Sequence, residues 1–191
     1  MTCRSLEFTI AGPVDTIVLV EEVVAGDGSI DLKFTVTVDE SGGVQADLRG
    51  LFWDVADESV LPGMTVVSAE SPDVTDAQFA ANAVDDLGNG ANMKGAITKK
   101  GAAFDAGVEI GTQGIGKDDV DATSFTLSGA DGVDLTLDAI GGMRFGVRLT
   151  SVGEEGARED SLKIAGVAPH APDALDDTYQ HEEDTILAGD V

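Results

Sequence analysis

The chain has 191 residues, of which 36 are Asp or Glu and 11 are Lys or Arg, and its formal net charge at pH 7 is −25. Proteins that bind nucleic acids or anionic membranes depend on positive surfaces, so this charge excludes most of both classes and favours cations as partners. With 42% hydrophobic residues the chain is apolar enough to bury a core, and its length suits one domain, with or without a tail.

The clearest predicted strand covers residues 30–39, where apolar and polar side chains alternate as they do in a half-buried strand. Its apolar set is Leu32, Phe34, Val36 and Val38. A glycine-containing turn at 40–43 leads into the apolar segment 44–55, which we expect to be the hairpin partner of 30–39, with a bulge around Gly50. Trp53 is expected to be the largest side chain of the core.

The rest of the chain up to residue 167 contains more strand patterns and little helical signal. Further strands are predicted over residues 63–69, 106–111, 123–128, 133–138, 143–152 and 161–166. One short helix is predicted over 75–84, with Thr75 as its N-cap. Short strands separated by glycine-rich connections predict an all-β fold, an antiparallel, jelly-roll-like β-sandwich with one short helix.

The sequence divides near residue 167. Residues 1–167 form the predicted β-sandwich domain, 168–172 read as a proline-containing linker, and 173–191 form a mostly acidic tail. There is no unbroken apolar stretch of about 18 residues, so no membrane insertion is expected. No Sec signal peptide is visible, because Glu21 and Glu22 interrupt the apolar run near the N-terminus.

The composition also restricts the possible chemistry. Cys3 is the single cysteine, and His170 and His181 are the only histidines, so residues 5–168 contain neither type. Disulfides, Cys/His zinc sites and nucleophile–histidine pairs are therefore not available in the predicted sandwich. Carboxylate, amide, hydroxyl and carbonyl oxygens remain, and these are the ligands that calcium prefers.

Three acidic clusters in the predicted sandwich have the oxygen density for Ca²⁺. Their candidate ligands are Asp27 and Asp31; Asp85, Asp86 and Asn89; and Asp118, Asp119 and Asp121. The first cluster has D-x-S-x-D spacing, and the second matches the EF-hand loop pattern only in part, because Leu87 occupies its third position. Solvated acidic loops are more common than calcium sites, so the alternative for each cluster is a surface loop.

Two glycine-rich segments resemble known motifs but depart from them. Residues 111–118 match the phosphate-binding loop GxxxxGK[ST] up to Lys117, but Asp118 replaces the hydroxyl residue and Asp119 adds a second negative charge. We therefore expect a sandwich loop there and no nucleotide site. Residues 129–137 resemble one turn of a calcium-binding nonapeptide repeat, but a β-roll needs tandem turns, so a hairpin turn is predicted.

The tail resembles a family. Its sequence Ala-Leu-Asp-Asp-Thr-Tyr, beginning at Ala174, is followed by Glu-Asp-Thr-Ile, beginning at Glu183. This is similar to the opening of the cadherin-like (VCBS-type) repeats of large secreted bacterial adhesins and haemolysin-type (RTX) calcium-binding proteins. Residues 168–191 are accordingly expected to be a linker and the start of a truncated cadherin-like repeat.

The resemblance implies further properties. In the family, these acids lie at module junctions where calcium stiffens the array, and the corresponding residues here are Asp176, Asp177, Glu183 and Asp184. Secretion by a type I route with a C-terminal signal is also implied, which agrees with the missing Sec peptide and predicts an extracellular location.

These observations favour a non-catalytic, calcium-binding β-sandwich module of a secreted bacterial adhesin-type protein, with calcium as its cofactor and a cell-surface glycan or protein as a further partner. The alternative is a carbohydrate-binding module, which is disfavoured because Trp53 and Tyr179 are the only residues of their kinds, leaving few rings for sugar stacking. A carboxylate-based hydrolase ranks third. Asp54 with Asp57, or Asp105 with Glu109, could supply paired carboxylates, but 36 acids produce such pairs by chance and no enzyme activity is expected.

Overall fold

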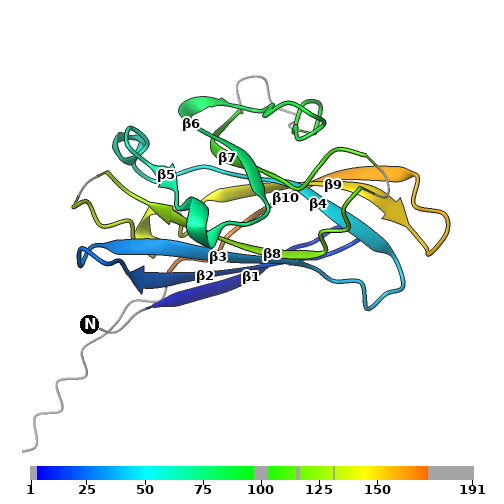
Figure 1. Ribbon diagram of the computed structural model, residues 1–191, viewed down its shortest axis with the longest axis horizontal. Coiled ribbons are helices and arrows are strands. Elements are labelled where there is room, and N and C mark those ends of the chain that lie inside the picture. The colour runs from blue at the N-terminus through cyan, green and yellow to red at the C-terminus, as the bar shows by residue number, and fades with distance from the viewer. Residues whose placement is uncertain (1–3, 97–102, 115–116, 131, 172–191) are drawn as a thin grey trace, which may run out of the picture.

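The computed structural model describes residues 4–96, 103–114, 117–130 and 132–171, and within them the strands form two five-stranded antiparallel sheets (Figure 1). Sheet A contains, in spatial order, β1 (Ser5–Ile10), β2 (Thr16–Val24), β3 (Ile30–Val38), β8 (Ala122–Ser128) and β5 (Thr65–Val66). Sheet B contains, in spatial order, β10 (Asp160–Val167), β9 (Arg144–Gly153), β4 (Gln45–Trp53), β7 (Phe104–Ile110) and β6 (Val74–Val84). The sheets stack as two layers, which confirms the predicted all-β sandwich.

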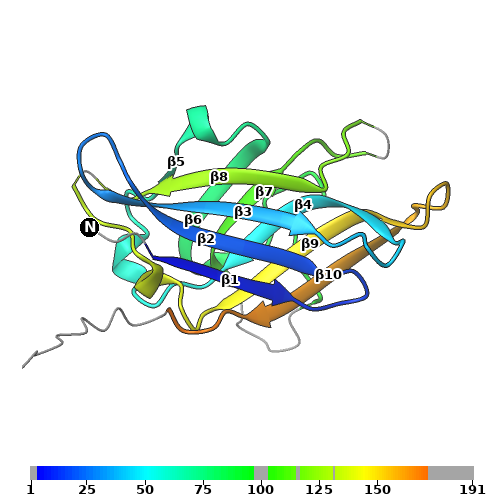
Figure 2. The ribbon, with the colours of Figure 1, turned by 90° about the horizontal axis from the view of Figure 1, so that it is seen from below.

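The connection after β3 crosses between the layers. β3 pairs with β2 and β8 in sheet A, whereas β4 pairs with β7 and β9 in sheet B (Figure 2). The predicted hairpin of 30–39 with 44–55 is therefore wrong, because alternation identifies the buried face of a strand but not its neighbours. The predicted bulge is confirmed, since the β4–β9 register shifts between Leu48 and Gly50.

The core between the sheets is centred on aromatic side chains. Phe34 of β3 stacks on Phe125 of β8 with ring centroids 4.9 Å apart, and Trp53 of β4 lies 5.5 Å from Phe34. Phe145 of β9 also stacks on Trp53, with ring centroids 6.5 Å apart. Trp53 has no exposed surface, which confirms its predicted place in the core.

The predicted helix over 75–84 is wrong, since these residues belong to strand β6. The segment contains four alanines, a glutamine and an asparagine, so local propensity does not favour a strand. Pairing with β7 decides the outcome: Ala77 lies opposite Val108 and Phe79 opposite Ala106. Phe79 also packs against Trp53 with an inter-centroid distance of 6.4 Å, so tertiary contacts override the local preference.

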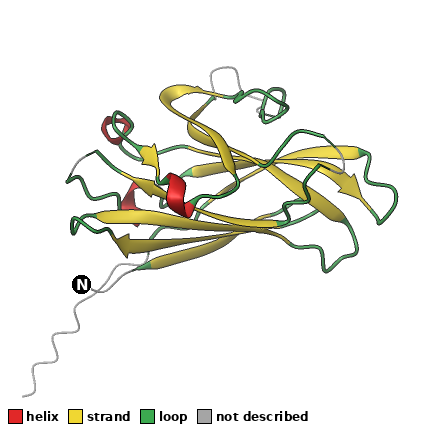
Figure 3. Cartoon of the chain, in the orientation of Figure 1, coloured by secondary structure: helices red, strands yellow, loops and turns green. Residues whose placement is uncertain are grey.

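Helix in the described residues is limited to three single 3₁₀ turns, η1 (Glu58–Val60), η2 (Ser68–Glu70) and η3 (Leu137–Ala139) (Figure 3). No helix in these ranges is long and apolar enough to cross a membrane.

Two other strand predictions fail where apolar loops pack on the core. The strand predicted over 133–138 is wrong, because Leu135 is buried in a loop and Leu137 is buried as the first residue of η3. No second strand follows the turn closed by Val133 N–H and the Ala130 carbonyl, so the predicted hairpin at 129–137 is also wrong. Of the strand predicted over 63–69, only Thr65 and Val66 form a strand, β5, which pairs with β8.

Sheet B also carries apolar side chains on its outer face, covered by residues 85–96. Figure 1 shows the segment that follows β6, residues 85–96, lying over the upper layer. Phe52 and Phe104 lie under it with ring centroids 5.9 Å apart, and the cluster is completed by Val84, Leu87, Ala91 and Met93. Gly107 and Gly146 make room for these side chains, because a Cβ at Gly146 would lie only 2.7 Å from Phe104 Cζ.

The packing of the sandwich continues past the predicted boundary at residue 167. Ala168 is buried, and its N–H donates to the Met143 carbonyl at 2.9 Å. The Pro169 carbonyl accepts a hydrogen bond from Gly142 N–H at 3.1 Å. The start of the predicted linker is thus fixed against the loop before β9.

Candidate functional site

The second predicted calcium loop is organised by a lysine and by the apolar cluster. Asp86 forms a 2.6 Å salt bridge with Lys94, which together with the Gly88 N–H lowers the pKa of the Asp86 carboxyl. The Asn89 carbonyl accepts hydrogen bonds from the Arg49 guanidinium, and the Asp85 carbonyl accepts one from Met93 N–H. Of the carboxylates predicted to bind calcium in this loop, that of Asp86 is therefore already paired with a cation.

In the third predicted cluster the three aspartates make different contacts. Asp118 accepts a hydrogen bond from Thr112 N–H, and the Asp121 carbonyl accepts one from Val38 N–H. Asp119 pairs with Arg158 at 2.7 Å. Residues 115 and 116 of the phosphate-loop-like segment lie outside the described residues, and strand β8 follows that segment.

Arg158 joins Asp119 to a second carboxylate, Asp47, at 2.6 Å. Burial is the main reason that the pKa of Asp47 is raised to about 6, and the Asp119 carboxylate adds to it. Hydrogen bonds from Arg158 lower the pKa of the more exposed Asp119 to about 2. The sequence prediction missed Asp47 and Arg158, because 111 residues separate them along the chain.

The first predicted cluster contains the feature that points most clearly to a cation. Asp27 Oδ1 accepts hydrogen bonds from the N–H and hydroxyl of Ser29, which lower its pKa. Asp31 is 93% buried, since only 7% of its surface is exposed, and its Oδ1 has no hydrogen-bond partner. Asp134, which the prediction did not include, accepts the Ile30 N–H at 2.9 Å, so a third carboxylate is fixed to the residue before Asp31.

Within the part of the chain that the structure describes, acidic side chains alone do not form a complete set of metal ligands. Among residues 4–96, 103–114, 117–130 and 132–171, no three Asp, Glu, His or Cys side chains come close enough together to hold a metal ion. The calcium assignments of the three loops stay predictions. Asp176, Asp177, Glu183 and Asp184 lie outside the described residues, as do Cys3 and His181.

The carboxylates considered for hydrolysis take part in structural contacts. Asp54 forms a salt bridge with Arg144 at 2.9 Å, and Asp57 caps η1 through the Ser59 N–H. Asp105 accepts the N–H groups of Val55 and Asn82, at 3.0 and 2.7 Å. Glu109 is buried and paired with Arg49. Each of the four carboxylates thus accepts hydrogen bonds from groups of the sandwich.

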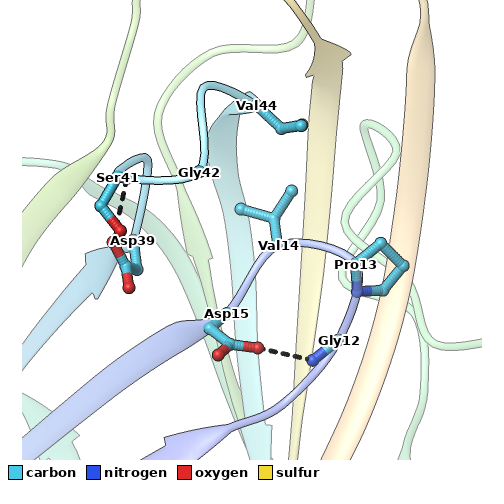
Figure 4. A pocket seen from close by; sticks show the side chains of 8 residues that line it. All are labelled: Gly12, Pro13, Val14, Asp15, Asp39, Ser41, Gly42 and Val44. Carbon is cyan, nitrogen blue, oxygen red and sulfur yellow. Dashed lines mark hydrogen bonds between the residues drawn. The ribbon is translucent and has the colours of Figure 1, made fainter.

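One pocket of about 270 Å³ lies between the β1–β2 and β3–β4 loops (Figure 4). It contains the side chains of Asp15 and Asp39, which the sequence prediction did not pair. Asp15 accepts the Gly12 N–H at 2.9 Å and Asp39 the Ser41 N–H at 3.0 Å. Each of the two aspartates therefore stabilises its own loop through a hydrogen bond.

A second pocket, of about 230 Å³, lies on the outer face of sheet B beside residues 85–96. Two arginines contribute to it, Arg49 of β4 and Arg148 of β9. The remaining lining is formed by Asn89, Gly90, Gln113, Gly114, Thr150, Ser151, Glu159, Asp160 and Ser161. No pattern along the chain could reveal this pocket, because its walls come from five separate segments.

Comparisons with models of protein families, with curated proteins and with solved structures gave no match for this chain.

Proposed function

We propose that the chain is a non-catalytic, calcium-binding β-sandwich module of a secreted bacterial adhesin-type protein. The expectation comes from the charge of −25 and from the resemblance of the tail to cadherin-like repeats. The observation that carries the proposal is the buried Asp31 Oδ1, which has no hydrogen-bond partner.

An unpaired carboxylate oxygen is costly to bury, because it loses its water and gains no donor. A calcium ion at this position would supply the missing positive charge. Asp27 lies four residues before Asp31, and Asp134 is hydrogen-bonded to Ile30, the residue before Asp31, so these two residues are the candidates for further oxygen ligands. We therefore propose a calcium site at the β2–β3 turn, with Asp31 as its principal ligand.

Thermal unfolding of the whole chain in millimolar CaCl₂, in MgCl₂ and in EDTA tests the proposal. A ligand present at 100 times its dissociation constant adds about 2.7 kcal/mol of stability, so a rise in Tm specific to calcium is expected. Asp31→Asn removes the buried charge and keeps the shape of the side chain. This variant should unfold at a higher temperature than the wild type in EDTA and should lose the calcium-specific rise.

Asp86→Asn is the matched control, because the Asp86 carboxylate is already paired with Lys94. It should keep the calcium-specific rise. A rise that persists in Asp31→Asn and disappears when Asp176, Asp177, Glu183 and Asp184 are all neutralised would move the site to the tail. Equal Tm values in the three buffers would contradict calcium binding altogether.

A further inference from the structure

Two positive side chains face each other on the outer surface of sheet B. Arg148 of β9 lies directly opposite Lys163 of β10 in the antiparallel register. Like charges in this position repel each other. The pKa of Lys163 is lowered, first by burial and then by the charge of Arg148. Within the described residues neither side chain forms a salt bridge, although the chain has 36 acids for 11 bases.

The hydrogen bonds of both cations go to neutral oxygens. Arg148 donates Nε–H to the Gly90 carbonyl at 3.1 Å and Nη1–H to the Leu162 carbonyl at 3.3 Å. Lys163 donates to the Asn92 side-chain oxygen and to the Lys94 carbonyl. The local positive charge is therefore held in place by protein groups that do not neutralise it.

The two arginines of the 230 Å³ pocket differ in how many of their N–H donors are already used within the protein. Arg49 is buried and donates from Nε, Nη1 and Nη2 to three carbonyls and to the Glu109 carboxylate. Arg148 is only half-buried, and its Nη2 donates to no group in the part of the chain that the structure describes. A guanidinium has five N–H donors, so Arg148 retains donors for a ligand. Arg49 lines the pocket, but all three of its nitrogens already donate to protein groups.

The other residues that line the pocket indicate which further groups the ligand has. Asn89, Gln113, Thr150 and Ser161 are neutral hydrogen-bonding residues, and Glu159 and Asp160 add acceptors. Such a lining suits a ligand with several hydroxyl groups. A volume of about 230 Å³ is below the range of roughly 300–1,000 Å³ for drug-sized ligands, so it suits a single small unit.

We propose that this pocket binds an acidic saccharide unit of the uronic-acid class, with its carboxylate on Arg148 and its hydroxyls on the neutral and acidic residues opposite. The carboxylate would reduce the repulsion between Arg148 and Lys163, and a guanidinium can bind it with two parallel hydrogen bonds. The pocket is distinct from the calcium site proposed at the β2–β3 turn and does not depend on it.

Titration of the ¹⁵N-labelled whole chain with galacturonic acid in EDTA buffer tests the proposal. Galacturonate should shift the signals of Arg148 Nε, Thr150 and Ser161 in a saturable way, while uncharged galactose should not. Arg148→Gln should weaken galacturonate binding by at least about tenfold, or about 1.4 kcal/mol. Ser161→Ala leaves the guanidinium intact and should weaken binding by a smaller factor.

Lys33→Gln is the matched control, because it removes one positive charge from β3 in the other sheet. It should leave galacturonate binding unchanged. Acetate that binds as tightly as galacturonate would show a simple anion site, and glycine or a short peptide that binds more tightly would show an amino-acid or peptide site. Either result overturns the saccharide assignment, as do the absence of shifts and equal binding by Arg148→Gln.

Discussion

The outer faces of the two sheets differ in how they meet solvent. On sheet A, β3 alternates fully buried residues with half-buried ones such as Lys33 and Thr35. On sheet B, every residue of β7 is buried, and so is every residue of β4 after Gln45. The difference arises because residues 85–96 cover the middle of sheet B, whereas the outer side of β3 is only partly covered.

This difference affects how strongly charged residues on the two outer faces interact. A charged residue on the outer face of β3 remains near water, where its interactions are weak. On β4 and β7 the corresponding positions hold the buried pair Arg49–Glu109. The candidate saccharide pocket lies at the margin of the covering loop, where burial ends and Arg148 is half-exposed.

The largest effect is expected from breaking the buried ion pair. Arg49→Met leaves the Glu109 carboxylate buried without its cation, which should cost about 3–5 kcal/mol of unfolding free energy in urea titrations. Lys33→Met on sheet A removes a charge near water and should change stability by no more than about 0.5 kcal/mol. The double variant Arg49→Met/Glu109→Leu should recover much of the loss. Equal effects of Arg49→Met and Lys33→Met would contradict the difference between the two faces.

An intermediate effect is expected from filling the space that glycine leaves under the loop. A Cβ at position 146 would lie 2.7 Å from Phe104 Cζ and 2.8 Å from Met93 Cε. Gly146→Ala should therefore destabilise the sandwich by about 1–3 kcal/mol, measured by denaturant unfolding. The control is Gly26→Ala in the β2–β3 turn, where a Cβ meets nothing within 4 Å. A neutral Gly146→Ala would mean that the loop does not pack on sheet B.

The smallest effect concerns pH. Burial raises the pKa of Asp47 on β4 from 3.8 to about 6, whereas the Ser41 hydroxyl and N–H lower the pKa of exposed Asp39 at the end of β3. A raised pKa means that the folded protein binds the proton more tightly than the unfolded chain. The contribution of Asp47 to stability therefore rises as the pH falls from about 6 towards 4, while that of Asp39 is lost as the pH falls below about 4.

Two variants separate these contributions. The stability difference between wild type and Asp47→Asn should grow in favour of the wild type as the pH is lowered from about 7 to 4. Asp39→Asn should show the opposite trend below about pH 4. Carboxyl NMR titration gives a direct reading, and Asp119→Asn should lower the pKa of Asp47 by removing the neighbouring carboxylate. Titration of Asp47 at or below 3.8 would refute the effect of burial.

Alternation along the chain predicted β3 closely, because one face of that strand packs on the core and the other is only half-buried. It did not identify β1 and β2, and it assigned residues 75–84 to a helix and 133–138 to a strand. In these segments, pairing with a neighbouring strand or packing of a loop decides the conformation, and both depend on residues distant in sequence. Asp31 was predicted from its spacing to Asp27, but the missing partner of its Oδ1 is visible only in the structure.

Composition and local periodicity are sufficient to predict the all-β class and the place of Trp53 in the core, and they give the large negative charge and the lack of Cys and His in residues 5–168. These properties follow from local periodicity and composition. The tertiary structure decided that β3 and β4 belong to different sheets, that Arg158 joins Asp47 to Asp119, and that Arg148 faces Lys163 beside a pocket. Each of these depends on which distant segments share a sheet and on which outer face is covered, and short-range patterns carry no information about either.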